Sequence, residues 1–212
     1  LDLEQTRPSG EFVIRNTGET TERYRIMASH FELGPSGSLN KIPPDENSLV
    51  PWIKFNPKEF SLPPKSRRSI RFVVVTKGKA VSKREYWCFM ELESLTVNKT
   101  SAQDKAGRTM TIQVVPSIIV PIFAKKGDVP INAEIGDITV LSIESGTQIQ
   151  AIVENTGNGH LLINGDYAFV DGSGTTVRSG AFAKTYIMPG NQREFKVKIK
   201  EDLPKGEYIV RV

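Results

Sequence analysis

Residues that could bind a metal ion are few in this chain and far apart. The two histidines, His30 and His160, are 130 residues apart, and neither has a cysteine or a carboxylate at the short spacing that metal ligands show. We therefore expect both histidines to be structural, either hydrogen-bonded or facing solvent. The sequence predicts no metal site and no cofactor.

Residues that could act in catalysis are also isolated. Cys88 lies in an apolar alternating segment with no histidine near it in sequence, which is typical of a buried small hydrophobe and not of a nucleophile. Glu91 and Glu93 share one face of a predicted strand, where solvated charge is the default for paired carboxylates. Nothing in these patterns predicts an enzyme.

Two short motifs have ordinary explanations. Gly172-Ser173-Gly174 follows Val170 and Asp171 but lacks the Lys-Ser/Thr pair and the helix of a phosphate-binding loop, so it predicts a hairpin turn. The sequence 98–100, Asn-Lys-Thr, matches a glycosylation acceptor, a motif that arises often by chance.

Composition and charge narrow the class of protein. The chain is 38% hydrophobic and 25% charged, which is typical of a soluble globular protein. Its net charge of +4 comes from dispersed Lys and Arg, which favours solvated strand faces over nucleic-acid binding. A single cysteine excludes an intramolecular disulfide. No run of about 18 apolar residues predicts a transmembrane helix, and no signal peptide is visible, although a chain that begins at Leu1 resembles a trimmed or mature form and leaves export open.

Period-two alternation runs through most of the chain and predicts strands, whereas no window has a helical period with caps. The fold class is therefore all-β. Residues 11–16 and 24–28 predict a hairpin-like pair, and 34–47 and 96–107 predict loops. Further strands are expected at 52–55, 69–76 and 85–95.

The segment 108–124 predicts one long strand. One set of its apolar residues keeps a single parity across the whole segment: Met110, Ile112, Val114, Ile118, Val120 and Ile122. In the second half Ile119 and Phe123 make the other parity apolar as well, so that end should be covered on both faces. Pro116 and Pro121 cannot donate to a ladder, so the strand must lie at an edge or contain a bulge. A long apolar edge strand either serves to bind another chain or is the last strand of an ordinary sandwich that runs into a linker.

An internal repeat organises the chain into two similar halves. Asn16-Thr17-Gly18 recurs as Asn155-Thr156-Gly157, residues 60–72 resemble 186–195, and Glu85-Tyr86 matches Glu207-Tyr208, at spacings of 139, 126 and 122 residues. Two tandem immunoglobulin-like β-sandwich domains, 1–125 and 126–212, are the simplest explanation.

The two halves differ after their last shared strand. The first continues into 108–124, whereas the second reaches Val212 without an equivalent strand, so that strand either lies beyond this sequence or is replaced by something else. The alternation predicts the interiors as follows: Trp52, Phe72, Tyr86 and Cys88 in the first domain, and Ile152, Tyr167, Phe195 and Tyr208 in the second.

The order of these motifs resembles the PapD-like periplasmic chaperones of pilus assembly. The resemblance covers essentially the whole chain, with its motifs in residues 52–123 and in the second half, and Arg84-Glu85 before an aromatic fits the family signature. It implies two immunoglobulin-like domains set as an L, in the periplasm. It also implies that the edge strand is donated to pilus or surface-protein subunits, with an outer-membrane usher as a further partner. The subunit-binding residues would be Met110, Ile112, Val114, Ile118 and Val120.

Two departures from the family pattern point to a divergent member with another client. Family members usually carry a basic residue in the second half of the donor strand, and that position falls on Ile119 here. The first strand, whose arginine completes the anchor for the subunit's terminal carboxylate, lies before Leu1 or is missing. The alternative function is a non-catalytic structural or adhesive module that binds a protein partner.

Overall fold

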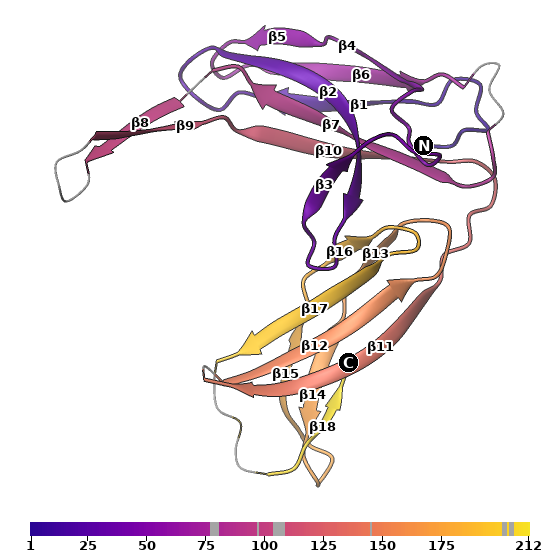
Figure 1. Ribbon diagram of the computed structural model, residues 1–212, viewed down its shortest axis with the longest axis vertical. Helices are drawn as coiled ribbons and strands as arrows, with labels where there is room; N and C mark the ends of the chain where they lie inside the picture. The colour runs from indigo at the N-terminus through magenta and orange to yellow at the C-terminus, as the bar shows by residue number, and fades with distance from the viewer. Residues whose placement is uncertain (77–80, 97, 104–108, 145, 201–202, 204–205) are drawn as a thin grey trace. The chain divides into compact units, whose positions relative to one another are not determined.

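The computed structural model describes residues 1–76, 81–96, 98–103, 109–144, 146–200, 203 and 206–212, with side chains throughout except in 98–103 and 109–114. Every regular element in these ranges is a β-strand and none is a helix, which confirms the all-β class. The chain divides into two compact units (Figure 1). The first comprises Leu1–Phe31 and Lys41–Asp128, and the second comprises Glu32–Asn40 and Val129–Val212.

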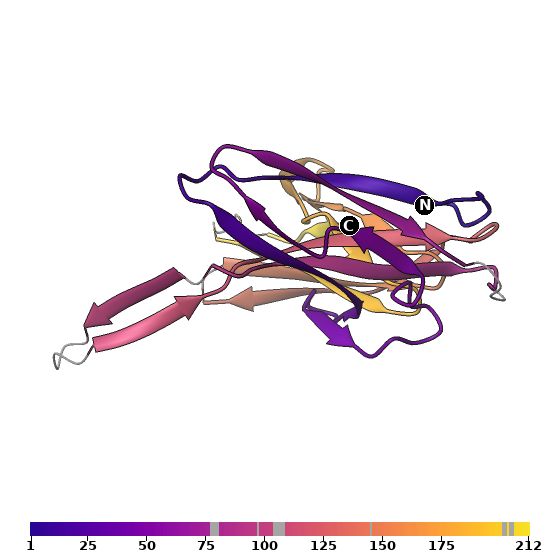
Figure 2. The same ribbon diagram turned by 90° about the horizontal axis from the view of Figure 1, so that it is seen from above.

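Two antiparallel sheets form the first unit. One has the order β1-β6-β4; the other has the order β10-β7-β2-β3, with β5 paired to β2. Among the described residues β8 and β9 pair with each other alone, and they form a hairpin beyond the ends of β7 and β10 (Figures 1 and 2). The bounds are β1 Ser9–Arg15, β2 Glu22–Leu33, β3 Leu39–Ile42, β4 Ile53–Asn56, β5 Glu59–Leu62, β6 Arg67–Val74, β7 Glu85–Ser94, β8 Asn98–Gln103, β9 Thr109–Val114 and β10 Ser117–Lys125.

The first core lies between these two sheets. Alternate residues of β6 (Ile70, Phe72 and Val74) are buried, as the period of a strand with one covered face requires. Strand β7 is buried almost throughout. One parity faces the core, and on the other parity Trp87 and Phe89 pack against the rings of His30 and Phe31. The prediction for Tyr86 and Cys88 is confirmed, since both belong to this core, and Trp52 is half-buried with its ring 4.8 Å from that of Tyr86.

The second unit repeats the sandwich with shorter strands. One sheet has the order β11-β12-β17, and a second has the order β15-β14-β18, with the small pair β13-β16. The bounds are β11 Ala133–Ile143, β12 Gly146–Asn155, β13 Leu161–Ile163, β14 Asp166–Val170, β15 Thr176–Ala181, β16 Thr185–Ile187, β17 Gln192–Ile199 and β18 Ile209–Arg211.

The second core contains three of the four predicted residues. Tyr167 and Phe195 are buried, and Tyr208 packs against them. The prediction for Ile152 is wrong: Ile149, Ala151 and Val153 face the core, so Ile152 lies on the opposite face of β12, beside Glu194 on β17. Both parities of this strand carry apolar residues, and alternation alone therefore could not choose between its faces.

Three local predictions from the sequence differ from the structure. Residues 11–16 and 24–28 do not form a hairpin, because β1 pairs with β6 and β2 pairs with β7, in the opposite sheet. Consecutive strands of a Greek-key sandwich often change sheets in this way. The predicted loop 34–47 contains the short strand β3, and the predicted loop 96–107 contains β8.

The repeated asparagine performs the same task in both units. Asn16 donates from Nδ2 to the carbonyl oxygens of Thr20 and Leu62 at 2.8 and 2.9 Å, and its Oδ1 accepts from the amide of Gly18. In the second unit Asn155 does the same.

Nδ2 of Asn155 donates to the carbonyls of Gly159 and Ile187 at 2.8 and 3.0 Å, while Oδ1 accepts from the Gly157 amide at 3.0 Å. Each asparagine side chain therefore links, by hydrogen bonds, the turn that follows its own strand to the end of a second strand. The shared motif reflects a shared structural position, as the repeat predicts.

Candidate functional site

The candidate site is the outer edge of β10. The alternation predicts one strand over 108–124, but the backbone forms two, β9 and β10, and residue 108 lies outside the described residues. Strand β10 pairs with β7, from Ser117 opposite Glu93 to Lys125 opposite Glu85, whereas β9 pairs with β8. The break falls at Val115 and Pro116, where the carbonyl of Pro116 accepts from the amide of Ser94 at the end of β7.

Only one end of that outer edge has a backbone partner among the described residues. The amide of Leu3 donates to the carbonyl of Lys125 at 2.8 Å, the amide of Lys125 donates to the carbonyl of Leu1 at 3.0 Å, and the terminal amine of Leu1 donates to the carbonyl of Phe123. Along 117–121 the described part of the chain provides no strand on this side. This is the geometry that strand addition needs, because unpaired backbone groups give the affinity.

The side chains of β10 change from exposed to buried along the strand. Ile118 is 50% and Ile119 is 40% exposed, Val120 is half-buried against the first core, and Ile122 and Ala124 belong to that core. Ile118 has the same parity as Ile122 and lies opposite Leu92 of β7, yet it is not part of the first core. The first part of β10 therefore presents apolar side chains beside free backbone.

The remaining predicted donor residues lie in β9. Met110, Ile112 and Val114 occupy alternate positions of that strand, opposite Ala102, Thr100 and Asn98 of β8, but their side chains are outside the described set. The β9 backbone pairs with β8 on one edge. Their role in binding stays a prediction.

Pro121 and Ile119 carried two predictions from the sequence: that this strand lies at an edge, and that it lacks the family's basic residue. Strand β10 is the outermost strand of its sheet, which confirms that its proline confines it to an edge. Ile119, at the position where the family carries a basic residue, is an exposed apolar side chain, so this strand offers no cation there to a terminal carboxylate.

Arg84 precedes β7 and Glu85 is its first residue; these two form the signature pair. The Arg84 guanidinium donates to Oδ1 of Asn47 at 2.9 Å and pairs with Glu46 at 2.8 Å, and this contact with Glu46 raises the pKa of the arginine. Glu85 is buried and lies opposite Lys125 of β10 in the ladder. Arg84 thus connects the loop before β4 to the strand that supports β10, which is a structural role.

The other candidates for chemistry are structural as well. His30 is buried; its Nδ1 donates to the carbonyl of Trp87 at 3.2 Å, and its Nε2 lies 2.9 Å from Oδ1 of Asp45. Burial raises the pKa of the Cys88 thiol to about 12, so almost none of it is thiolate at neutral pH. Glu91 differs from the prediction of a solvated carboxylate, because it is buried and pairs with Lys41 at 2.5 Å.

The segment around Gly172-Ser173-Gly174 is the predicted hairpin turn. It joins β14 to β15, and Oδ1 of Asp171 accepts from the Ser173 hydroxyl at 2.6 Å and from the Thr175 amide at 3.0 Å. The Ser173 hydroxyl contact in particular lowers the pKa of Asp171. No group of three or more potential metal ligands occurs among the described residues, and none of those residues forms a helix with the length and apolarity to cross a bilayer.

The second unit also has an apolar edge. Ile135, Ile138 and Val140 of β11 lie opposite or beside the core residues of β12, yet they are 60%, 44% and 43% exposed. In the described residues β18 pairs only with β14, whereas its counterpart β7 in the first unit also pairs with β10.

No protein-family model and no curated protein matches the chain. Among solved structures, the YadV chaperone is similar with a TM-score of 0.50 and 12% identity over 98% of this chain and 83% of that one. The Pseudomonas aeruginosa CupB2 chaperone is similar with a TM-score of 0.48 and 11% identity, over 92% of this chain and 81% of that one. A chain of a CsuC-CsuE chaperone–subunit complex from Acinetobacter baumannii is similar with a TM-score of 0.48 and 12% identity, over 95% of this chain and 84% of that one. The chain therefore has the fold of the PapD-like chaperones, with two immunoglobulin-like sandwiches.

Proposed function

We propose that this chain is an assembly chaperone that completes the sandwich of a strand-deficient partner with its β10 edge. The observation that carries the proposal is the outer edge of 117–121, where the described part of the chain supplies no partner strand, beside the exposed side chains of Ile118 and Ile119. In strand addition the backbone ladder supplies affinity and alternate apolar side chains set the register. Strand β9, which continues the same apolar alternation, extends the donated segment.

The likeness of fold to the YadV chaperone supports a chaperone role. The sequence resemblance to the PapD-like family extends the proposal to a pilus or other surface subunit as the client, bound in the periplasm and passed to an outer-membrane usher. Because Ile119 replaces the family's basic residue, this chain would hold its client by backbone pairing and apolar contacts, without an anchor for a terminal carboxylate on this strand.

Two substitutions on β10 test strand donation. Ile118→Asp should change the unfolding free energy of the chain by less than about 0.5 kcal/mol, because half of this side chain already faces water. The same change should abolish the complex with a client, since it would bury a carboxylate without a partner in an apolar groove. The assay is co-purification with subunits encoded beside this chain's own gene.

Ile122→Asp is the matched control on the same strand. Ile122 is buried in the first core, so this substitution should destabilise the first unit by more than about 3 kcal/mol. A client complex that survives Ile118→Asp would reject donation through β10. It would favour the alternative of a structural or adhesive module that binds through another surface.

A further inference from the structure

The outer face of the β1-β6-β4 sheet concentrates positive charge. Side chains on this face alternate with the core residues of β6, and the strand register places Arg15 opposite Arg67 and Glu11 opposite Arg71. With Lys54 on β4, which pairs with β6, and Arg7 just before β1, the face has five cations and one carboxylate. Its net charge of +4 equals that of the whole chain, so the rest of the protein is neutral in sum.

Most of these cations have no acidic partner. The Arg71 guanidinium pairs with the Glu11 carboxylate at 3.5 Å. Within the described residues no ion pair is made by the other four cations, Arg7, Arg15, Lys54 and Arg67. Neighbouring cations just off this face do have partners.

Lys65 pairs with Glu19, and the Arg68 guanidinium lies 5.2 Å from the centre of the Phe60 ring. Like charges directly opposite each other in a ladder destabilise a sheet. The opposed Arg15 and Arg67 therefore carry a repulsion that a bound anion would remove.

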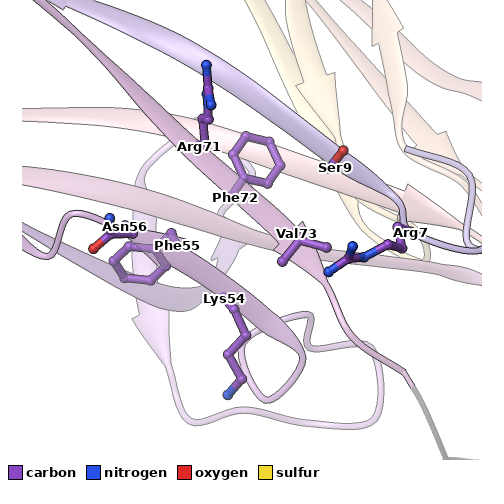
Figure 3. Close-up of a pocket in the computed structure, with 8 residues that line it drawn as sticks. All are labelled: Arg7, Ser9, Lys54, Phe55, Asn56, Arg71, Phe72 and Val73. Atoms are coloured by element: carbon purple, nitrogen blue, oxygen red, sulfur yellow. The ribbon is translucent and has the colours of Figure 1, made fainter.

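The cations are spread along the face and do not converge on one point. An open depression of about 650 Å³ lies at one end, and Figure 3 shows Arg71 and Lys54 pointing to opposite sides of it while Arg7 reaches toward Val73. A second open depression, of about 430 Å³, is lined by Arg15 and Arg67 at the other end. This spacing suits an extended anionic surface better than one small ligand.

The chemistry of the face identifies that surface. Single-stranded nucleic acid would need exposed aromatic rings for stacking, but Phe12, Phe55 and Phe72 lie on the inner parity and pack in or against the first core. Between the cations stands Val13, a 52% exposed apolar side chain. Arginines beside small apolar side chains match lipid phosphates at the boundary between headgroups and acyl chains.

We propose that the outer face of the β1-β6-β4 sheet docks on a bilayer through the phosphate groups of anionic phospholipids. The lipids of a bilayer diffuse laterally, so their phosphates can adjust to cations that point in different directions. This inference goes beyond strand donation and does not rest on it, because its residues lie in the opposite sheet from β10.

Co-sedimentation of the full chain with vesicles tests the inference. The protein should bind vesicles that contain phosphatidylglycerol and not vesicles of phosphatidylcholine alone. Because each cation near an anionic bilayer contributes about fivefold to binding, Arg15→Gln with Arg67→Gln should weaken it about thirtyfold. Salt at about 1 M, where the Debye length is about 3 Å, should release the protein.

The matched control is Lys184→Gln with Lys198→Gln, two exposed cations of the second unit. It removes the same charge and should leave vesicle binding unchanged. An equal loss in the control, or unchanged binding of the arginine variant, would overturn the proposal.

Two soluble probes separate the possible sources of the anion. Binding of poly-glutamate without any dependence on phosphatidylglycerol would also overturn the proposal, in favour of an acidic protein partner. If inorganic phosphate binds at Arg15 and Arg67 while vesicles do not bind, the face is a site for free anions. That result would overturn the proposal of bilayer docking.

Discussion

Replacing Asn155 by Ala should destabilise the second unit alone. The side chain is fully buried and makes three hydrogen bonds, to the carbonyls of Gly159 and Ile187 and from the amide of Gly157. Each lost bond leaves a backbone group without that partner at a net cost of about 1 kcal/mol, so the substitution should cost about 3 kcal/mol. Asn16→Ala should cost a similar amount in the first unit, where Asn16 makes the equivalent contacts.

The two tryptophans allow the two units to be followed separately. Trp52 and Trp87 both belong to the first unit, so urea unfolding followed by tryptophan fluorescence reports on that unit, whereas far-ultraviolet circular dichroism reports on both. Asn155→Ala should move the dichroism transition and leave the fluorescence transition in place, and Asn16→Ala should move the fluorescence transition. Asn158→Ala, an exposed neighbour, is the control and should cost less than about 0.5 kcal/mol.

Asn155→Asp adds a test of the hydrogen-bond directions. A carboxylate cannot donate to the carbonyls of Gly159 and Ile187, so the folded state should raise the pKa of this new group above the value of about 3.9 in the unfolded chain. The stability of the variant should then be highest below about pH 4 and fall as the pH rises through the folded pKa. The total loss should be about 1.4 kcal/mol for each pH unit that separates the unfolded pKa from the folded pKa. A flat pH profile, or a loss below about 1 kcal/mol for Asn155→Ala, would refute the assignment.

Three further predictions concern packing and reactivity. Phe72→Ala and Phe195→Ala should each cost about 3–5 kcal/mol in urea unfolding, because both rings are buried in the cores, and a cost below about 1 kcal/mol would contradict their placement. Gly180→Ala should cost about 1–3 kcal/mol in the same measurement, since a Cβ there would lie 2.5 Å from the hydroxyl of Tyr167. Cys88 should resist thiol reagents at pH 8 until the chain is unfolded. Because burial raises its pKa from 9.0 to about 12, this thiol should also make the folded state less stable as the pH rises from about 9 toward 12; rapid labelling of the folded protein would show that it is accessible.

Alternation in the sequence predicted where the strands lie better than it predicted which strands pair with each other. The period-two pattern identifies the inward residues of β6, because Arg67, Ser69 and Arg71 occupy the other parity of that strand. It fails on Ile152, where the neighbours Ala151 and Val153 are apolar too. It cannot show that β1 and β2 lie in different sheets, since sheet membership depends on long-range pairing that local pattern does not record.

The candidate site was also predictable only in part, because some of its features are local in sequence and others depend on long-range pairing. Pro121 has no amide to donate, so it predicts either an edge strand or a bulge, and the topology places β10 at an edge. The break at Pro116 coincides with the end of β7, where the amide of Ser94 donates to the carbonyl of Pro116, a long-range contact that the local pattern does not record. The basic face was missed because its members are spread along the sequence from Arg7 to Arg71, and only the register brings Arg15 opposite Arg67.

The two proposed surfaces of the first unit should work independently. The β10 edge belongs to one sheet of the sandwich and the basic face is the outer side of the other, with the shared core between them. A client on β10 therefore need not cover Arg15 or Arg67, and a bilayer on those arginines need not cover Ile118. Ile118→Asp should keep vesicle binding, and Arg15→Gln with Arg67→Gln should keep client binding. Loss of both activities in either variant, with an unchanged melting temperature, would mean that one surface serves both partners.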